Sequence, residues 1–259
     1  MTNKARLSEL YSRISKHSQY QMPAMNMCGL IDADSKLRCH SHYENERLDF
    51  LLDKIDVRGK KILDIGGNTG YFSFELLNRG AESIVFYEGN KDHAEFVKEV
   101  ADFLGLSRKL EVHSEYYGFS GSNDDNQYDI VLLLNVLHHV GDDYGEKFTT
   151  IGSAKNEIIR ELLSVISKTE YIFFQLGFNW HGNRNMPLFT NGTKSEMIHF
   201  IHDGIKDYCD ILHIGIAETT KSGRTKYMPL TDRNVMRDDA KGEFLNRPLF
   251  ILRSKYADA

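Results

Sequence analysis

An almost unbroken apolar run at residues 128–134 constrains the fold of this chain more than any other feature. It reads Tyr-Asp-Ile-Val-Leu-Leu-Leu and includes β-branched members. Such a run is typical of a strand in a parallel sheet, where both faces are covered. Runs of similar length recur along the chain, separated by stretches with helical spacing. This alternation predicts an α/β protein.

The predicted elements follow from this alternation. We expect strands at 61–65, 83–87, 110–113, 128–134, 171–176, 211–217 and 248–252. We expect helices at 71–77, 93–104, 154–167 and 198–205. The polar segment 218–247 has no sustained period, which predicts a loop and a last strand antiparallel to its neighbours. The expected fold is a seven-stranded, mostly parallel sheet with helices on both faces.

The remaining organisation is simple. We expect residues 1–259 to form a single domain, with 1–45 as an N-terminal helical extension or lid and 46–259 as the core. Neither a signal peptide nor a membrane span is evident, so we expect a cytoplasmic protein. The three cysteines are odd in number and have no metal-binding spacing, which predicts free thiols.

A glycine-rich turn follows the first predicted strand. Gly66, Gly67 and Gly70 stand where the strand would turn into a helix, which allows a ligand to approach the backbone closely. The alternative is a tight connection without a ligand. Asp64 precedes the turn, and Glu88 ends the second predicted strand, where a carboxylate can accept hydrogen bonds from both hydroxyls of a ribose. A solvated charge is the alternative for Glu88.

The charges at this turn discriminate between cofactors. The glycine spacing differs from the G-x-G-x-x-G pattern of dinucleotide-binding turns, and Asp64 would repel a diphosphate. S-adenosylmethionine (SAM) carries a sulfonium and an ammonium group, which nearby acidic groups attract. The turn therefore favours SAM over NAD, and an NAD-linked oxidoreductase is the less favoured reading.

These segments resemble the motifs of class I SAM-dependent methyltransferases. The resemblance is carried by 63–70, 86–88 and 128–131 and covers about residues 45–176. It implies a Rossmann-like sheet whose last strand is antiparallel, and a SAM site that includes Asn68. The family often has glycine where this chain has Asn68. We therefore expect the loop to lie slightly farther from the cofactor here.

A narrower resemblance concerns the acceptor. Segments 45–49, 136–140 and 247–250 are similar to methyltransferases that modify bacterial cell-surface polysaccharides, including O-antigen chain terminators. A related pattern occurs in enzymes that modify the wobble uridine of transfer RNA. The first resemblance implies a role in polysaccharide biosynthesis.

Candidate catalytic residues follow the fourth predicted strand. In this fold the methyl group points toward the ends of the first and fourth strands, so Asn135, His138 and His139 should face it. A hydroxyl acceptor needs a base, and histidine suits that role. Adjacent histidines on a helix point about 100° apart, so only one can serve. We favour His139, although either histidine could simply bond the backbone, and we expect no metal.

Two further groups complete the candidate site. Asn179, Trp180 and Arg184, in the loop after the fifth predicted strand, suit a sugar because they combine a stacking face with hydrogen-bonding groups. The alternative is a polar loop with one half-buried tryptophan. Arg47, before the first strand, is a candidate for pairing with the carboxylate of SAM. A solvent-exposed helical arginine is its alternative.

The leading hypothesis is an enzyme that methylates an oxygen of a sugar or of a charged group on a saccharide. The net charge of −5 provides no general attraction to a polyanion, so nucleic acid is not the expected partner, although a local basic patch would permit it. An RNA-modifying methyltransferase and a non-catalytic SAM-binding domain are the alternatives. The oligomeric state cannot be read from the sequence.

Overall fold

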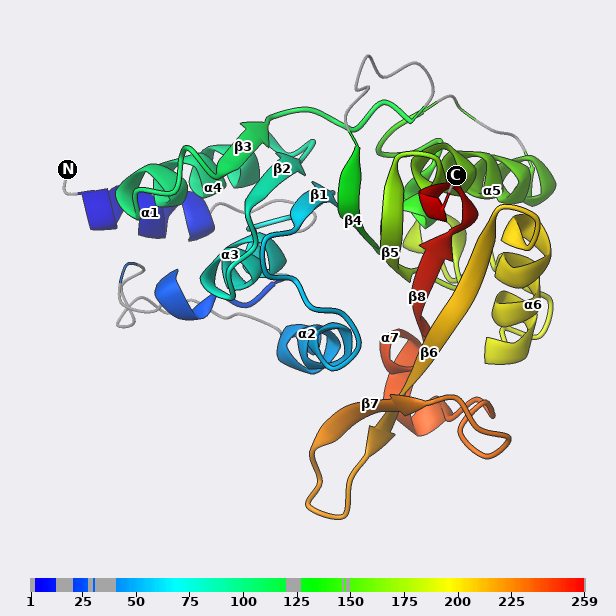
Figure 1. Ribbon diagram of the computed structural model, residues 1–259. Helices are drawn as coiled ribbons and strands as arrows, with labels where there is room; N and C mark the ends of the chain where they lie inside the picture. Colours follow the sequence, from blue (N-terminus) through cyan, green and yellow to red (C-terminus); the bar gives the residue numbers. More distant parts are fainter. Residues whose placement is uncertain are drawn as a thin grey trace. The chain divides into compact units, whose positions relative to one another are not determined.

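The internal contacts of the chain divide it into two units, which are described separately. Unit 1 consists of Met1–Leu48 and Leu52–Tyr117, and unit 2 consists of Asp49–Leu51 and Gly118–Ala259. The computed structural model describes residues 3–12, 21–27, 30, 41–119, 127–145, 147 and 150–258 (Figure 1). Cys28 and Cys39, predicted as free thiols, lie outside these residues, whereas Cys209 is a buried free thiol. The single-domain organisation stays a prediction.

Unit 1 is built on parallel strands. Strand β2 (Ser83–Tyr87) pairs in parallel with β1 (Lys61–Ile65) and with β3 (Leu110–His113). The helices that begin in this unit are α1 (Asn3–Ser12), α2 (Glu44–Leu52), α3 (Tyr71–Asn78) and α4 (Lys91–Phe103), and α1 packs against α4. Helix α4 begins where the Asn90 side chain accepts the backbone N–H groups of Asp92 and His93, at 3.0 and 3.3 Å. The β1–α3 and β2–α4 connections thus end at the same edge of parallel strands.

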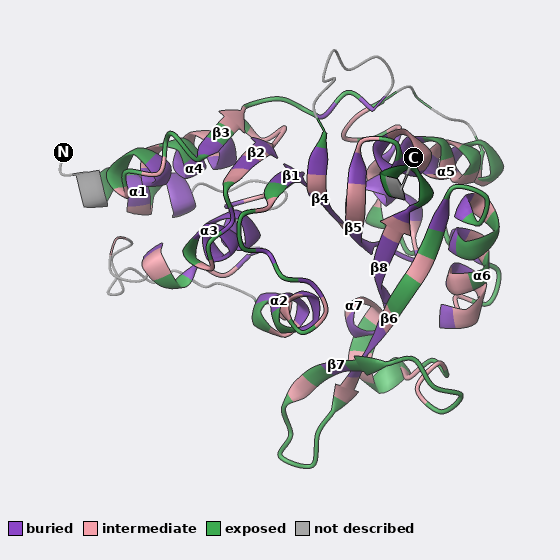
Figure 2. Cartoon of the chain, viewed as in Figure 1, coloured by how far each residue is buried: buried purple, intermediate pink, exposed green. Residues whose placement is uncertain are grey.

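Unit 2 contains the remaining strands in the order β4-β5-β8-β6-β7. Their bounds are β4 (Tyr128–Leu134), β5 (Thr169–Gln175), β6 (Cys209–Thr219), β7 (Thr225–Pro229) and β8 (Leu249–Ser254). Strands β4 and β5 are parallel, while β8 runs antiparallel to both β5 and β6. The helices are α5 (Ile151–Ile166), α6 (Lys194–Ile205) and α7 (Gly242–Leu245), with short turns at Leu137–His139 and Trp180–Gly182. Figure 2 shows that β4, β5 and β8 are largely buried, whereas the β6–β7 hairpin is largely exposed.

The fold class predicted from the sequence is confirmed: every predicted strand is present, and the last strand is antiparallel. The difference is β7, which lies in the segment predicted as a loop, so the described residues contain eight strands. Within β7 only Tyr227 is buried, and the other residues are exposed or half-buried. A single buried residue leaves no alternating apolar pattern to detect. Among the helices of the described residues, none combines the length and apolar character that crossing a membrane requires.

Candidate cofactor and acceptor sites

The glycine turn of unit 1 uses left-handed backbone at three positions. Gly66, Asn68 and Gly70 have φ angles of 68°, 55° and 80°. Asparagine tolerates this region better than most residues because its short polar side chain can bond locally. Here the Asn68 Oδ1 atom accepts the backbone N–H of Thr69 at 2.9 Å. Asn68 therefore adopts the conformation that a glycine would otherwise supply.

Gly67 is required by close packing. A Cβ atom at this position would lie 2.1 Å from a ring carbon of Phe86 and 2.8 Å from the Asp64 Oδ2 atom. The backbone N–H of Gly66 donates to the Tyr87 carbonyl at 2.8 Å, which holds the turn against β2. No side chain fits at Gly67 without displacing one of these groups.

Asp64 is a buried carboxylic acid at the end of β1. It is 4% exposed, and its Oδ2 atom accepts the Ser73 hydroxyl at 2.6 Å. Together, burial, the opposing Ser73 hydrogen bond and the charge of Glu88 raise the pKa of Asp64 to about 7, and burial has the largest effect. A cation that bound beside this carboxyl group would favour its ionised form.

Glu88 joins the glycine turn to α4. Its Oε2 atom accepts the backbone N–H of Asn68 at 2.8 Å, and its Oε1 atom accepts that of Asn90 at 2.7 Å. The predicted ribose-binding residue is thus fixed in place by backbone groups on both sides.

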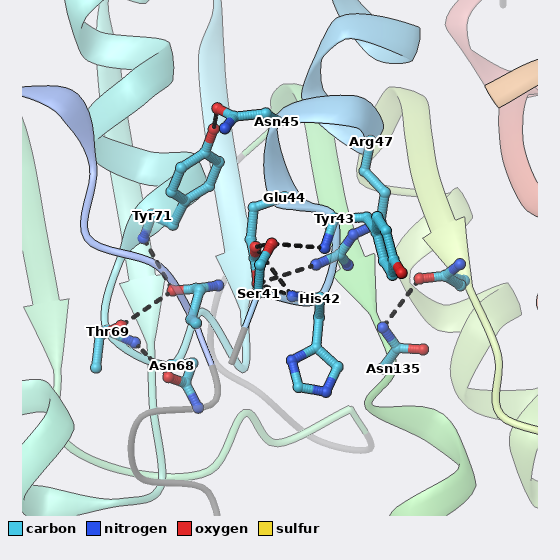
Figure 3. A network of polar contacts seen from close by, with 12 residues as sticks. Ser41, His42, Tyr43, Glu44, Asn45, Arg47, Asn68, Thr69, Tyr71 and Asn135 are labelled. Carbon is cyan, nitrogen blue, oxygen red and sulfur yellow. Dashed lines mark hydrogen bonds and ion pairs between the residues drawn. The ribbon is translucent and has the colours of Figure 1, made fainter. Parts of the chain in front are cut away.

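Arg47 is buried rather than solvated. It is 4% exposed, its guanidinium lies 5.1 Å from the ring centroid of Phe72, and its Nη2 atom lies 3.9 Å from the Glu44 Oε1 atom. Glu44 in turn accepts the Ser41 hydroxyl and the His42 backbone N–H (Figure 3). Phe72 belongs to the first turn of α3, so Arg47 lies beside the helix that follows the glycine turn.

Gln21 is a residue that sequence reasoning missed. Its Oε1 atom accepts the backbone N–H of Tyr71 at 2.9 Å and lies 3.3 Å from the Thr69 hydroxyl, while its carbonyl accepts the Tyr11 hydroxyl at 2.7 Å. The N-terminal extension thus contacts the glycine turn directly. No local pattern marks Gln21, because the neighbouring sequence has no period.

Asn135, the remaining predicted cofactor residue, lies in unit 2 directly after β4. It has a left-handed backbone with φ 63°, and its Nδ2 atom donates to the Gln175 Oε1 atom at 3.0 Å (Figure 3). Its Oδ1 atom accepts the Arg247 Nη1 atom at 2.8 Å. Arg247 is therefore a second residue of the candidate site that the sequence did not single out for this role.

His138 and His139 have different environments. His138 is 2% exposed, and its Nδ1 atom accepts the Gly177 backbone N–H at 3.3 Å. His139 is more accessible, and its Nδ1 atom lies 3.2 Å from the Asp143 Oδ2 atom. A carboxylate beside one ring nitrogen favours a proton there and leaves the other nitrogen as the acceptor, as a general base requires. The choice of His139 as the base stays a prediction.

The same turn gathers three possible metal ligands. Donor atoms of His139, Asp142 and Asp143 all lie within 4.8 Å of one another. Such a set can arise without an ion on a solvent-facing loop, and the expectation that no metal takes part stays a prediction.

The loop after β5 holds its aromatic residue inward. Trp180 is 2% exposed, and its Nε1 atom donates to the Val140 carbonyl at 2.7 Å. It fastens this loop to the turn after β4, so a sugar could stack on its ring only if the loop opened. Asn179 is half-buried and Arg184 is exposed. The predicted substrate residues thus share one loop but differ in their access to solvent.

A strand, a glycine turn and a helix, followed by a parallel strand that ends at an acidic residue, form an arrangement typical of α/β folds that bind nucleoside-containing cofactors. A family model described as a methyltransferase domain matches residues 38–176, more than half of the chain. The chain therefore belongs to this methyltransferase family.

Curated relatives share part of the chain. A tRNA U34 carboxymethyltransferase from Helicobacter acinonychis is 26% identical over 110 residues, which are 40% of this chain and 40% of that enzyme. An enzyme of the same name from Campylobacter hominis is 32% identical over 90 residues, 34% of this chain and 30% of that enzyme. The chain thus aligns with less than half the length of these relatives.

Solved structures confirm the fold over a longer span. The crystal structure of WbdD superimposes with a TM-score of 0.55 at 15% identity, covering 95% of this chain and 46% of WbdD. WbdD is a bifunctional kinase-methyltransferase. At this identity the likeness shows the Rossmann-like α/β fold.

Proposed function

We propose that SAM is bound by the glycine turn of unit 1, and the buried Asp64 carboxyl beside Glu88 is the observation that carries this proposal. Two acidic side chains at one turn attract a cationic ligand and repel a diphosphate. When bound, SAM supplies an electrophilic methyl carbon. Asn135, which lies in unit 2 directly after β4, stays a sequence-based prediction as a cofactor contact.

The positions of the polar groups in unit 1 fit this cofactor. Glu88 follows β2, where a carboxylate can accept hydrogen bonds from ribose hydroxyls, and backbone N–H groups of Asn68 and Asn90 hold it there. Arg47 is the candidate for the methionyl carboxylate, because its buried guanidinium lies beside Phe72 in the first turn of α3, the helix that follows the glycine turn. Gln21, from the proposed N-terminal extension of residues 1–45, holds the turn to α3.

We propose further that the acceptor is an oxygen of a sugar, or of a charged group on a saccharide, as in surface polysaccharide biosynthesis. His139 would accept the proton of a hydroxyl acceptor, with Asp143 orienting its ring. Asn179 and Arg184 would contact the acceptor from the loop after β5. A phosphate or carboxylate oxygen is already anionic and would need positioning without a base.

An acceptor screen with labelled SAM tests this proposal. Neutral glycans, uronic acid glycans and phosphorylated glycans should be offered separately, and methyl transfer to at least one class is expected. For a hydroxyl acceptor, His139→Ala should lower kcat by ~100- to 10,000-fold, whereas for an anionic oxygen it should change kcat by less than about threefold. His181→Ala is the matched control, since this half-buried histidine lies outside the proposed catalytic set. Transfer to none of the glycans would refute the saccharide proposal.

RNA is the second candidate acceptor, because the curated relatives are named as tRNA-modifying enzymes. A local feature supports it: Lys221, Arg224 and Lys226 are exposed on the β6–β7 hairpin, and no carboxylate of the described residues pairs with them. Unpaired cations on one projection suit a phosphate backbone despite the negative net charge.

Changing these three residues to glutamine tests the RNA candidate. RNA affinity should fall, and the slope of log K against log salt should decrease by about 0.7 for each lost phosphate contact. A control variant removes the same charge from exposed positions elsewhere, Lys98, Arg108 and Lys109. Equal losses in the two variants, or no RNA binding by the wild type, would exclude this surface as an RNA site.

A further inference from the structure

An ion pair between the buried Arg247 and the half-buried Glu243 contacts the segments of unit 2 that follow β4 and β5. Arg247 is 8% exposed and follows the short helix α7, which carries Glu243. The Arg247 Nε atom donates to both carboxylate oxygens of Glu243, at 3.0 and 3.1 Å, and its Nη2 atom contacts the same carboxylate. The guanidinium also lies 5.1 Å from the ring centroid of Phe244. Packing and hydrogen bonds therefore fix the guanidinium from two sides.

The pair fastens two segments that follow neighbouring strands. Toward β4, the Arg247 Nη1 atom donates to the Asn135 Oδ1 atom at 2.8 Å. Toward β5, the Glu243 Oε1 atom accepts the backbone N–H of Phe178 at 2.9 Å, and the Arg247 carbonyl accepts Gln175 Nε2 at 3.2 Å. These segments carry the proposed catalytic and acceptor residues.

The position of Asn135 depends on these contacts. Its left-handed backbone is unusual for a residue other than glycine and persists only where the surroundings impose it. Gln175 bonds Asn135 through backbone and side chain, at 2.8 and 3.0 Å, and Arg247 donates to the Asn135 Oδ1 atom. Among the described residues, no partner is bonded to the second N–H of the Asn135 amide, whose direction is set by Gln175 and Arg247 together.

The negative charge of Glu243 beside Arg247 limits the roles that Arg247 can have. Its charge is balanced by Glu243, and its donors are directed at Glu243 and Asn135, so it is poorly suited to bind a substrate anion. Burial would raise the pKa of Glu243, but the charge and hydrogen bonds of Arg247 and the Phe178 N–H lower it below its ordinary value. The Glu243 carboxylate therefore stays ionised at neutral pH.

We propose that Glu243 and Arg247 are a positioning pair, which orients the Asn135 amide and the backbone at Phe178 for methyl transfer without touching either reactant. This inference rests on the proposal that the ends of β4 and β5 form the acceptor side. A displacement of catalytic groups by about 1 Å can lower a rate on the order of a hundredfold, so loss of the pair should act mainly on kcat.

Arg247→Gln tests the pair in two ways. Without reactants, hydrogen exchange at the Phe178 amide should become at least ~10-fold faster, because its acceptor loses the partner that fixes it. With reactants, kcat should fall by ~10- to 100-fold, and because Asn135 is a predicted cofactor contact, the Kd for SAM measured by calorimetry should also rise, but by a smaller factor than kcat falls. Arg160→Gln is the matched control, because Arg160 also pairs with a nearby glutamate, Glu157, but lies on α5 and is exposed.

A double-mutant cycle tests whether Arg247 affects kcat through Asn135. If Arg247 acts through Asn135, then Arg247→Gln combined with Asn135→Ala should reduce kcat no more than the larger single change. Multiplicative losses, or an unchanged Phe178 exchange rate in folded Arg247→Gln, would overturn the positioning role. If Arg247→Gln does not fold, Glu243→Gln replaces it, since it removes the charge but keeps the size.

The exchange measurement also separates this inference from the proposed function. It requires no acceptor, so a wild type that methylates no acceptor would refute the proposed function while the exchange result still decides whether the pair orders the segment. Faster exchange in the variant together with unchanged kcat would show a purely structural pair and would overturn the inference.

Discussion

Replacing Asp64 with asparagine should weaken SAM binding by ~10- to 100-fold at about pH 7.5, since it removes a buried carboxylate close to the proposed site of the cationic ligand. Asparagine has nearly the same shape, and its side chain can still accept the Ser73 hydroxyl. Calorimetric titration of SAM into both proteins measures the change. Equal affinities would contradict the electrostatic basis proposed for cofactor choice.

The same substitution should abolish a dependence of SAM affinity on pH. The pKa of Asp64 in the folded protein is raised to about 7, so the folded state disfavours the ionised carboxylate. Ionisation of Asp64 therefore lowers the free energy of unfolding of the ligand-free protein as the pH rises from about 4 toward 7. A bound cation favours the ionised form, so SAM affinity should increase from about pH 5.5 to about pH 7.5, with proton release at the acidic end. In Asp64→Asn both effects should be absent.

Glu88→Gln is a control for which the direction of the shift in pH dependence can be stated in advance. The charge of Glu88 contributes to the raised pKa of Asp64, so its removal should lower that pKa and move the rise in SAM affinity to lower pH. An upward shift, or an unchanged pH dependence in Asp64→Asn, would show that another group is responsible.

Gly67→Ala should be the most damaging small substitution in unit 1. The added methyl group would lie 2.1 Å from the Phe86 ring, in a turn held on both sides by backbone hydrogen bonds. We expect a loss of ~1–3 kcal/mol in the free energy of unfolding from overpacking, together with loss of measurable SAM binding. Denaturant unfolding and calorimetry measure the two effects.

Gly118→Ala is the control for Gly67→Ala, because nothing lies within 4 Å of its added methyl group. Its stability and SAM affinity should remain close to those of the wild type. If Gly67→Ala behaved like this control, the turn would be more deformable than its contacts indicate, and it could not be the rigid base of a cofactor site.

The sequence was most informative where chemistry and periodicity coincide. The apolar run at 128–134 predicted β4, and the glycine spacing placed the strand-to-helix turn between Asp64 and Tyr71. Glu88 could be placed because the end of a parallel strand fixes where its following residue lies. These features depend on neighbouring residues, which local patterns encode.

Features that depend on distant partners could not be predicted. Arg247 contacts a side chain 112 residues away, and Gln21 bonds a backbone group 50 residues away, so neither pairing leaves a local pattern. Trp180 illustrates another limit, because composition cannot tell a stacking surface from a buried ring with a bonded indole N–H. Only the three-dimensional contacts distinguish these cases.

Calorimetric titration of SAM into the wild type and into Glu88→Ala, with NAD as the control ligand, tests the central claim most directly. The account predicts saturable SAM binding by the wild type, binding weakened by ~1–3 kcal/mol in the variant because ribose hydroxyls lose their acceptor, and no measurable binding of NAD. Absence of SAM binding to the wild type, or tighter binding of NAD than of SAM, would contradict it.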